Sequence, residues 1–285
     1  MNNHEIMVSI CCITYNHENY IAQAIESFLM QETNFSYELI IGEDCSTDNT
    51  RAIIEQYCEK YPGRIKLIGE QQNVGAVRNH LNVIQKARGK YIATCDGDDY
   101  WTDPLKLQKQ VDFMENNPDY TICCHYTRVI NEKDELVYEN PLPIKLEYDY
   151  EDVLMGNREE TRMCSLIVKN NHQVRAISKQ DWYHKTYGSD TLFKLFALSK
   201  TSGKMCVLPE VMAVYRLHKG GVWSLIDNKI RQNRSINDFN IMISNFQYSS
   251  SHKRKLLAFY LNRYFLFDIK TLNISRAFYT LFTLI

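Results

Sequence analysis

Apolar runs alternate with amphipathic stretches through the first 125 residues of the chain. Short apolar runs predict strands at residues 6–14, 37–42, 64–68, 91–95 and 120–125. Apolar residues at helical spacing predict helices at residues 19–30, 48–59, 77–87 and 104–116. Repeated strand–helix alternation predicts a mostly parallel central sheet with helices on both faces. The expected fold class is therefore α/β.

The alternation becomes less regular after residue 125. The pattern predicts a hairpin over 128–138, strands at 163–168 and 207–215, and a helix near 191–199. Beyond Trp223 the pattern is helical to the end. We therefore expect one domain over residues 1–224, with halves of about 1–125 and 126–224, followed by a helical C-terminal extension at 225–285.

Composition narrows the class of protein without identifying it. The chain has 45% hydrophobic and 24% charged residues and a formal net charge of −1, so no overall field attracts it to nucleic acid. No apolar stretch reaches the roughly 20 residues that span a bilayer, and residues 1–5 lack the features of a signal peptide. We expect a cytoplasmic protein that makes no integral membrane span.

The cysteines also favour a cytoplasmic protein. There are nine, and none forms a C-x-x-C pair, which argues against a structural zinc site. Several lie inside apolar runs, where thiols pack as small hydrophobic groups, which indicates a reducing compartment. These are Cys11, Cys12, Cys95, Cys123 and Cys124.

Three acids directly follow the predicted strand at 91–95: Asp96, Asp98 and Asp99. Carboxylates this close repel one another and raise one another's pKa. A divalent cation relieves the repulsion, and aspartate oxygens suit Mg²⁺ or Mn²⁺. The alternative is an acidic loop that also caps a helix at Asp103.

Two other predicted strands also end in polar segments, at residues 14–17 and 43–48. Ligands of parallel sheets bind beyond the carboxyl ends of the strands. Asp44 could accept a hydrogen bond from a base or a ribose, and Tyr15 could stack on a base. Asp44 could instead belong to a turn, but Ser46 and Asp48 are the more natural helix caps, which leaves Asp44 for a ligand.

A further segment, residues 73–79, places Gly75 before a helix and Arg78 one turn inside it. Backbone N–H groups and a guanidinium in this arrangement can bind phosphate. Glycine before a helix is common, so this segment alone is weak evidence for a phosphate-binding site.

Taken together, these segments resemble the family 2 inverting glycosyltransferases, which have the GT-A fold and use nucleotide-diphosphate sugars. Four family motifs match in order and spacing: an apolar strand with T-Y-N, then D-D-G-S-T-D-x-T, N-x-G with R-N, and D-x-D-D. In this chain they lie at 13–16, 42–50, 73–79 and 96–99. Glu43 and Cys45 replace the usual Asp and Gly.

The resemblance implies a role for each matched residue, and a nucleotide-binding half at about 1–125. The implied nucleotide-binding residues are Thr14, Tyr15, Asn16, Asp44, Arg78, Asp96, Gly97 and Asp98. Asp98 and Asp99 would hold the Mn²⁺ or Mg²⁺ ion that bridges the two phosphates, and which of them ligates directly stays open.

The acceptor half, about 126–224, would supply the base that deprotonates the attacking hydroxyl. The family places a carboxylate before a helix there, and Asp190 fits, although an N-cap role is the alternative. Asp181, Glu159 and Glu160 are the other candidates.

Residues 215–224, with two glycines and Trp223, resemble the family's loop that closes over the donor. In that loop His218 would complete the metal shell or contact the diphosphate. Arg216 and Lys219 would add positive charge at the phosphates.

Basic and aromatic residues interleave in the C-terminal stretch from Lys253 to Arg276. This composition suits a helix that lies on an anionic membrane surface. Packing on the domain or on a second subunit of a homodimer is the alternative.

The sequence therefore predicts a metal-dependent inverting glycosyltransferase of surface polysaccharide synthesis. The donor would be a nucleotide-diphosphate sugar, with UDP favoured by family frequency, and the acceptor a saccharide or lipid-linked saccharide. A nucleotidyltransferase acting on sugar phosphates is one alternative, but residues 14–17 lack its Gly-rich basic loop. A non-catalytic scaffold of a polysaccharide assembly complex is the other.

Overall fold

The computed structural model describes residues 6–69, 71–221 and 226–285. Its strands are β1 (Val8–Thr14), β2 (Tyr37–Glu43), β3 (Ile65–Gly69), β4 (Tyr91–Thr94), β5 (Tyr100–Trp101), β6 (Tyr120–Asn131), β7 (Leu136–Tyr138), β8 (Leu146–Tyr148), β9 (Ile167–Lys169) and β10 (Lys204–Leu217). In these residues they form one ten-stranded sheet in the order β3-β2-β1-β4-β9-β6-β10-β5, with β7 beside β6 and β8 beside β10.

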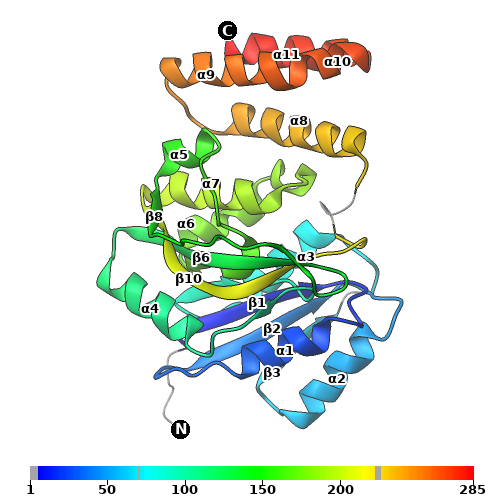
Figure 1. Ribbon diagram of the computed structural model, residues 1–285, viewed down its shortest axis with the longest axis vertical. Coiled ribbons are helices and arrows are strands. Elements are labelled where there is room, and N and C mark those ends of the chain that lie inside the picture. Colours follow the sequence, from blue (N-terminus) through cyan, green and yellow to red (C-terminus); the bar gives the residue numbers. More distant parts are fainter. Residues whose placement is uncertain (1–5, 70, 222–225) are drawn as a thin grey trace.

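The helices cover both faces of the sheet and extend beyond it (Figure 1). They are α1 (Ile21–Leu29), α2 (Thr50–Lys60), α3 (Ala76–Lys86), α4 (Lys106–Asn116), α5 (Tyr150–Leu154), α6 (His172–Arg175), α7 (Ser189–Thr201), α8 (Asn228–Asn245), α9 (Ser250–Tyr260), α10 (Leu266–Lys270) and α11 (Ile274–Leu284). Short 3₁₀ turns lie at Met163–Ser165, Ala176–Lys179 and Tyr183–Lys185, and a π-helical turn at Leu261–Phe265 follows α9.

The predicted α/β class, with a central sheet flanked by helices, is confirmed. β3, β2, β1 and β4 are all parallel, so their carboxyl ends meet at one edge. Beyond β4 the sheet is mixed, because β9 runs antiparallel to both β4 and β6. The mixed part carries β9, β6, β10 and β5, with β7 and β8 beside them.

Apolar residues on both faces of the sheet make two large clusters. In β1, Cys11 packs into one cluster while Ile10 and Cys12 pack into the other, because successive side chains of a strand point to opposite faces. All nine cysteines lie in the described part of the chain and are free thiols, and seven are buried.

One predicted strand was wrong over part of its length. Residues 163–168 were expected to be extended, but Met163–Ser165 form a 3₁₀ turn and pairing in β9 starts only at Ile167. The turn is stable because side chains replace sheet partners: Trp101 Nε1 donates to the Cys164 carbonyl at 2.8 Å and Gln110 Nε2 to the Ser165 carbonyl at 2.9 Å.

The expected helical extension is present as α8 to α11. In Figure 1, α8 lies between the layer of α5 and α7 and the layer of α9 to α11. The extension has an apolar cluster of its own, and Phe246 joins it to the main core by packing on Trp182 with ring centroids 5.3 Å apart. The expected boundary at 224–225 falls outside the described residues. No helix in the described part combines the length and the hydrophobicity that crossing a bilayer requires.

Candidate active site

A cleft of about 1180 Å³ opens beyond the carboxyl ends of the parallel strands. We call it the central cleft. Eight of the predicted site residues line it: Thr14, Tyr15, Asp44, Arg78, Asp96, Asp98, Asp99 and Asp190. Parallel β1, β2 and β4 bring three of the polar segments to one edge, and the first turn of α7 brings Asp190. Segments separated by more than 170 residues therefore share one cavity.

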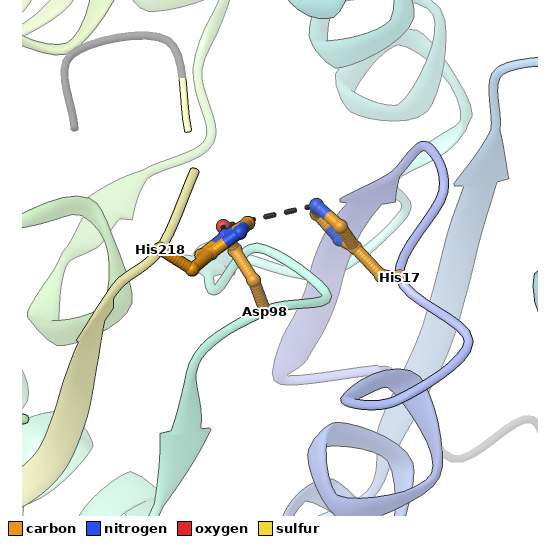
Figure 2. A group of neighbouring side chains, drawn as sticks. All are labelled: His17, Asp98 and His218. Carbon is orange, nitrogen blue, oxygen red and sulfur yellow. Dashed lines mark hydrogen bonds and ion pairs between the residues drawn. The ribbon is translucent and has the colours of Figure 1, made fainter. Parts of the chain in front are cut away.

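Two histidines flank one of the acids in this cleft. Asp98 Oδ2 lies 2.8 Å from His218 Nε2 and 3.7 Å from His17 Nε2. Figure 2 shows the three side chains converging from the loop after β1, the turn after β4 and the end of β10. One ligand atom from each lies within 4.8 Å of the others. This group could hold a divalent metal ion.

The neighbouring acid, Asp99, lies outside that group. Its Oδ1 accepts a hydrogen bond from the Arg216 backbone N–H at 2.9 Å, and its side chain is buried. Burial and the charge of Asp98 raise the pKa of Asp99 well above its usual value. The geometry thus favours Asp98 over Asp99 as the metal ligand. The hydrogen bond of Asp99 to the Arg216 backbone connects the turn after β4 to β10.

The acids of the cleft differ in their affinity for protons. Burial, the charge of Asp98 and that of Asp190 raise the pKa of Asp96 to about 8. Burial would also raise the pKa of Asp98, but the hydrogen bond from His218 and the charge of His17 outweigh it and lower the pKa. Burial lowers the pKa of His17. A cation would stabilise this crowded negative charge.

The chemistry of the donor set fits a transition-metal ion. Carboxylate and water ligands suit Mg²⁺ and Mn²⁺ alike, whereas imidazole nitrogens suit transition metals. With two imidazoles beside Asp98, the site suits Mn²⁺ better than Mg²⁺. Neutral imidazole is the ligating form, and the lowered pKa of His17 favours that form.

On the nucleotide side, Asp44 is engaged more fully than the sequence indicated. Its two carboxylate oxygens accept the backbone N–H groups of Val74 at 2.7 Å and Gly75 at 2.9 Å. Asp44 therefore holds the loop that precedes α3, a role that the sequence did not indicate, and its role toward a ligand stays a prediction. It still lines the cleft beside Tyr15, whose side chain is exposed.

Asn16 and Gly97 support the cleft without lining it. Asn16 Oδ1 accepts the Thr47 backbone N–H at 2.8 Å, so it joins the loops after β1 and β2. A Cβ atom at position 97 would lie 2.8 Å from Thr14 Oγ1 and 3.0 Å from Ile21 Cδ1, so only glycine fits there. Thr14 Oγ1 is buried and has no hydrogen-bond partner among the described residues.

Asp190 lies in the first turn of α7, after the N-cap residue Gly188. It is the candidate base that the cleft contains, since Asp181, Glu159 and Glu160 are absent from the described lining. Its side chain is 38% exposed and lies 3.5 Å from Lys194 Nζ. Burial would raise the pKa of Asp190, but Lys194, the Thr191 backbone N–H and Arg158 outweigh it and hold the pKa below its usual value.

The predicted closing loop is only partly described. Tyr215, Gly220 and Gly221 line the central cleft, and Trp223 and Ser224 lie outside the described residues. Arg216 does not line the cleft: its guanidinium pairs with Asp134 Oδ1 at 2.5 Å and Gln23 Oε1 at 2.8 Å. Lys219 does not line it either among the described residues.

Sequence reasoning missed three side chains at this site. His17 belongs to the polar segment at 14–17, and its place at a strand end was a usable signal. His80 lines the cleft with its buried Nε2 unpartnered among the described residues, and burial lowers its pKa to about 4. Asp238 of α8 accepts the backbone N–H groups of Tyr187 at 2.9 Å and Gly188 at 2.5 Å; no local pattern indicates this long-range contact.

A family model and several known proteins are similar to this chain in sequence. The family model described as "Glycosyl transferase family 2" matches residues 9–186, which is more than half of the chain. The uncharacterized protein Rv1520 of Mycobacterium tuberculosis is 38% identical over 220 residues, 76% of this chain and 60% of the relative. The chain thus spans about 60% of that relative's length. TuaG of Bacillus subtilis, named for teichuronic acid biosynthesis, is 40% identical over 114 residues, 40% of this chain and 44% of TuaG.

Solved structures share the fold. S. aureus TarS, residues 1–349, in complex with UDP superposes with a TM-score of 0.66 at 21% identity, over 91% of this chain and 72% of that one. The mannosyltransferase PcManGT from Pyrobaculum calidifontis, in complex with GDP-Man and Mn²⁺, gives a TM-score of 0.64 at 16% identity, over 99% and 74%.

Proposed function

Because the chain belongs to glycosyl transferase family 2, we propose that it transfers a sugar, with inversion, from a nucleotide-diphosphate donor to an acceptor hydroxyl. Its membership confirms the resemblance drawn from the four sequence motifs, and the shared fold confirms the predicted GT-A architecture. What remains a proposal is the chemistry at this chain's own residues.

One observation carries the proposal: a group suited to a metal lies at the central cleft, which His17 and Asp98 line and His218 does not, and one carboxylate suited to a base lines the cleft separately. His17, Asp98 and His218 make the first, and Asp190 the second. A transferase needs both, because negative charge accumulates on the leaving diphosphate while the acceptor hydroxyl loses a proton. A bound Mn²⁺ ion would neutralise charge on the diphosphate.

The protein's own groups account for the acceptor side. Asp190 is held ionised by Lys194, so it can accept a proton at neutral pH. With one base and no second carboxylate assigned as nucleophile, the transfer takes place in a single displacement that inverts the anomeric centre. The hydroxyl of the acceptor takes the place that water occupies in an inverting glycosidase.

On the donor side we assign the nucleoside to Thr14, Tyr15 and Asp44, with Arg78 and Asp96 near the diphosphate and ribose. Tyr15 offers an exposed ring for stacking, and the unpartnered Thr14 hydroxyl offers a hydrogen bond. UDP is the nucleotide we propose, and the TarS complex with UDP is consistent with it.

The acceptor we propose is a saccharide or lipid-linked saccharide of polysaccharide synthesis, which agrees with the naming of the relative TuaG for teichuronic acid biosynthesis. A lipid-linked acceptor would be reached at the cytoplasmic face of a membrane. The extension, which exposes apolar side chains such as Phe278 and Phe282, is the surface we propose for that contact.

The test is donor turnover by the purified chain across UDP-, GDP- and dTDP-sugars, with Mn²⁺, with Mg²⁺ and with a chelator. We expect Mn²⁺-dependent release of the nucleotide diphosphate from the sugars of one of these three nucleotides. Asp98→Asn should weaken Mn²⁺-dependent nucleotide binding. Asp190→Asn should leave that binding unchanged and lower transfer by roughly 10²–10⁴-fold.

Asp181→Asn is the matched control, because it removes a nearby carboxylate that does not line the described cleft. It should retain activity. Full turnover by a folded Asp98→Asn variant would contradict the metal site, and full turnover by Asp190→Asn would move the base to another carboxylate.

A further inference from the structure

A second cavity lies where the helical extension meets the loop that precedes α7. It has a volume of about 420 Å³, and we call it the extension pocket. Its described lining is Tyr187, Ile230, Asn233, Arg234, Asn237 and Arg276. Tyr187 lines the central cleft as well, so one side chain borders both cavities.

The extension pocket is close to the base and fixed relative to it. Tyr187 precedes Asp190 by three residues, so their Cα atoms are at most about 11 Å apart. Helix α8 binds this loop: Asp238 accepts the N–H groups of Tyr187 and Gly188, and Asn237 Nδ2 donates to the Lys185 carbonyl at 2.9 Å. A saccharide whose hydroxyl reaches Asp190 can therefore extend past Tyr187 into the pocket.

The described lining of the pocket is cationic, because it includes two arginines and no acid. Asp268 pairs with Arg276 and also accepts the Tyr260 hydroxyl at 2.6 Å, and it is fully buried. Arg276 Nη2 donates to Asn233 Oδ1 at 3.0 Å, while Nη1 has no hydrogen-bond partner among the described residues. A guanidinium held on one edge in this way can present its other edge to an anion.

The remaining lining suits a sugar. Tyr187 is 45% exposed, and the Arg234 guanidinium lies 5.0 Å from the centre of its ring, so an aromatic ring and a positive charge are adjacent. Asn233 and Asn237 add amide groups that can donate to and accept from hydroxyls. Arginine is the residue best suited to planar carboxylate or to phosphate, which it can bind through two N–H groups.

We propose that the extension pocket is an acceptor subsite that binds an anionic group, carboxylate or phosphate, carried by the acceptor saccharide. This inference rests on the proposed transferase function and names the class of its acceptor. It assigns the helical extension a direct part in acceptor recognition, with Arg234 and Arg276 as the anion contacts.

The experiment measures binding of small probes to the full chain loaded with UDP and Mn²⁺, by ligand-observed NMR titration. The probes are a nitrophenyl glucoside, the matching nitrophenyl glucuronide and a hexose phosphate. We expect the better anionic probe to bind at least about tenfold more tightly than the neutral glucoside, with an advantage that shrinks as salt is added. A preference for the glucuronide or for the hexose phosphate identifies the anion as carboxylate or phosphate.

Arg234→Gln should remove the advantage of the anionic probe and leave binding of the glucoside unchanged. Arg231→Gln is the matched control, since it removes the same charge from α8 at a residue absent from the described lining. Equal affinity for all probes, including no affinity for any, would overturn the inference, and so would an unchanged preference in Arg234→Gln. Failure to bind UDP would instead count against the proposed function, because the two readouts are separate.

Discussion

At the scale of single residues, the proposed base Asp190 is influenced by its neighbour one helical turn away, Lys194. Lys194 is buried, donates to the Thr161 carbonyl at 2.5 Å and lies 3.5 Å from Asp190. Its positive charge opposes the burial of Asp190 and the negative charges of Asp96 and Asp238, which both lie within electrostatic range. If Asp190 is the base, Lys194 compensates the charge around it.

Lys194→Met should shift the pH profile of transfer. Without the ammonium, burial raises the pKa of Asp190, and the base becomes protonated at a higher pH. Since activity needs the ionised carboxylate, the acidic limb of kcat should move to higher pH. The profile is measured with saturating donor, and a Ser199→Ala variant near the end of the same helix serves as the control. An unmoved acidic limb would show that Lys194 does not set the charge state of the base.

The sequence predicted much of the site but not its connections. Asp98, His218 and Asp190 were expected at one site from the family resemblance, and the structure places Asp98 and Asp190 at the cleft and His218 beside Asp98, while their roles stay predictions. The two hydrogen bonds that Asp44 accepts from the backbone N–H groups of Val74 and Gly75 were missed. The partners of a carboxylate depend on loops that only the fold brings together. Motif reasoning also could not choose between Asp98 and Asp99, because that choice depends on which carboxylate the Arg216 N–H engages.

At the scale of elements, α8 is a support for the start of α7. Gly188 is the N-cap of α7, yet no side chain within α7 caps it. Asp238 supplies the missing acceptor from α8 and fixes two consecutive N–H groups just before Asp190. These two hydrogen bonds hold the loop that leads into α7.

Asp238→Ala should lower kcat while leaving the KM for the donor nearly unchanged. Loss of both acceptors frees the 187–188 backbone, and a displacement of about 1 Å at the base can cost roughly 10²-fold in rate. Asp238→Asn should be intermediate, because its amide retains one acceptor oxygen in place of two. Kinetics with the full chain and thermal unfolding distinguish the cases; equal kcat in all three proteins would exclude the positioning role. We expect Asp238→Ala to lower the unfolding free energy by about 1–3 kcal/mol.

Most elements were predictable from periodicity, because strands and helices of the first 125 residues bury one regular face each. The failures lie where tertiary contacts override that pattern. Residues 163–165 are apolar enough for a strand, but Trp101 and Gln110 bind their carbonyls and stabilise a turn. β6 continues to Asn131, beyond the predicted end at residue 125, because it pairs with β10 over its whole length.

At the scale of the whole molecule, the end farthest from the sheet presents exposed apolar side chains. Ile274, Phe278 and Phe282 of α11 and Ile285, which follows it, are 40–81% exposed and recur at helical spacing on one face. Leu266 and Leu272 are exposed nearby, as is Lys270. A surface of this kind suits the boundary between lipid headgroups and acyl chains.

A Phe278→Ser, Phe282→Ser variant should therefore bind anionic liposomes more weakly than the parent chain. The two rings stack on each other and are 55% and 76% exposed, so their removal should leave the buried cluster of the extension folded. Co-sedimentation with anionic and with neutral vesicles is the measurement, and circular dichroism checks the fold. Equal sedimentation of variant and parent would exclude a membrane role for this face, and concentration-dependent light scattering would then test a second copy as its partner.

The position of β9 in the sheet has a consequence for how the chain folds during synthesis. β9 lies between β4 and β6, although both of those strands precede it in the sequence. The parallel strands β1 to β4 and strand β6 therefore cannot join into one sheet until residue 169 has left the ribosome, and β10 is added only afterwards. Closing that gap requires contacts between residues about 75 positions apart, such as Ala93 with Ile167, and non-local contacts of this kind slow folding. The last strand to arrive at the centre thus decides when the two halves become one structure.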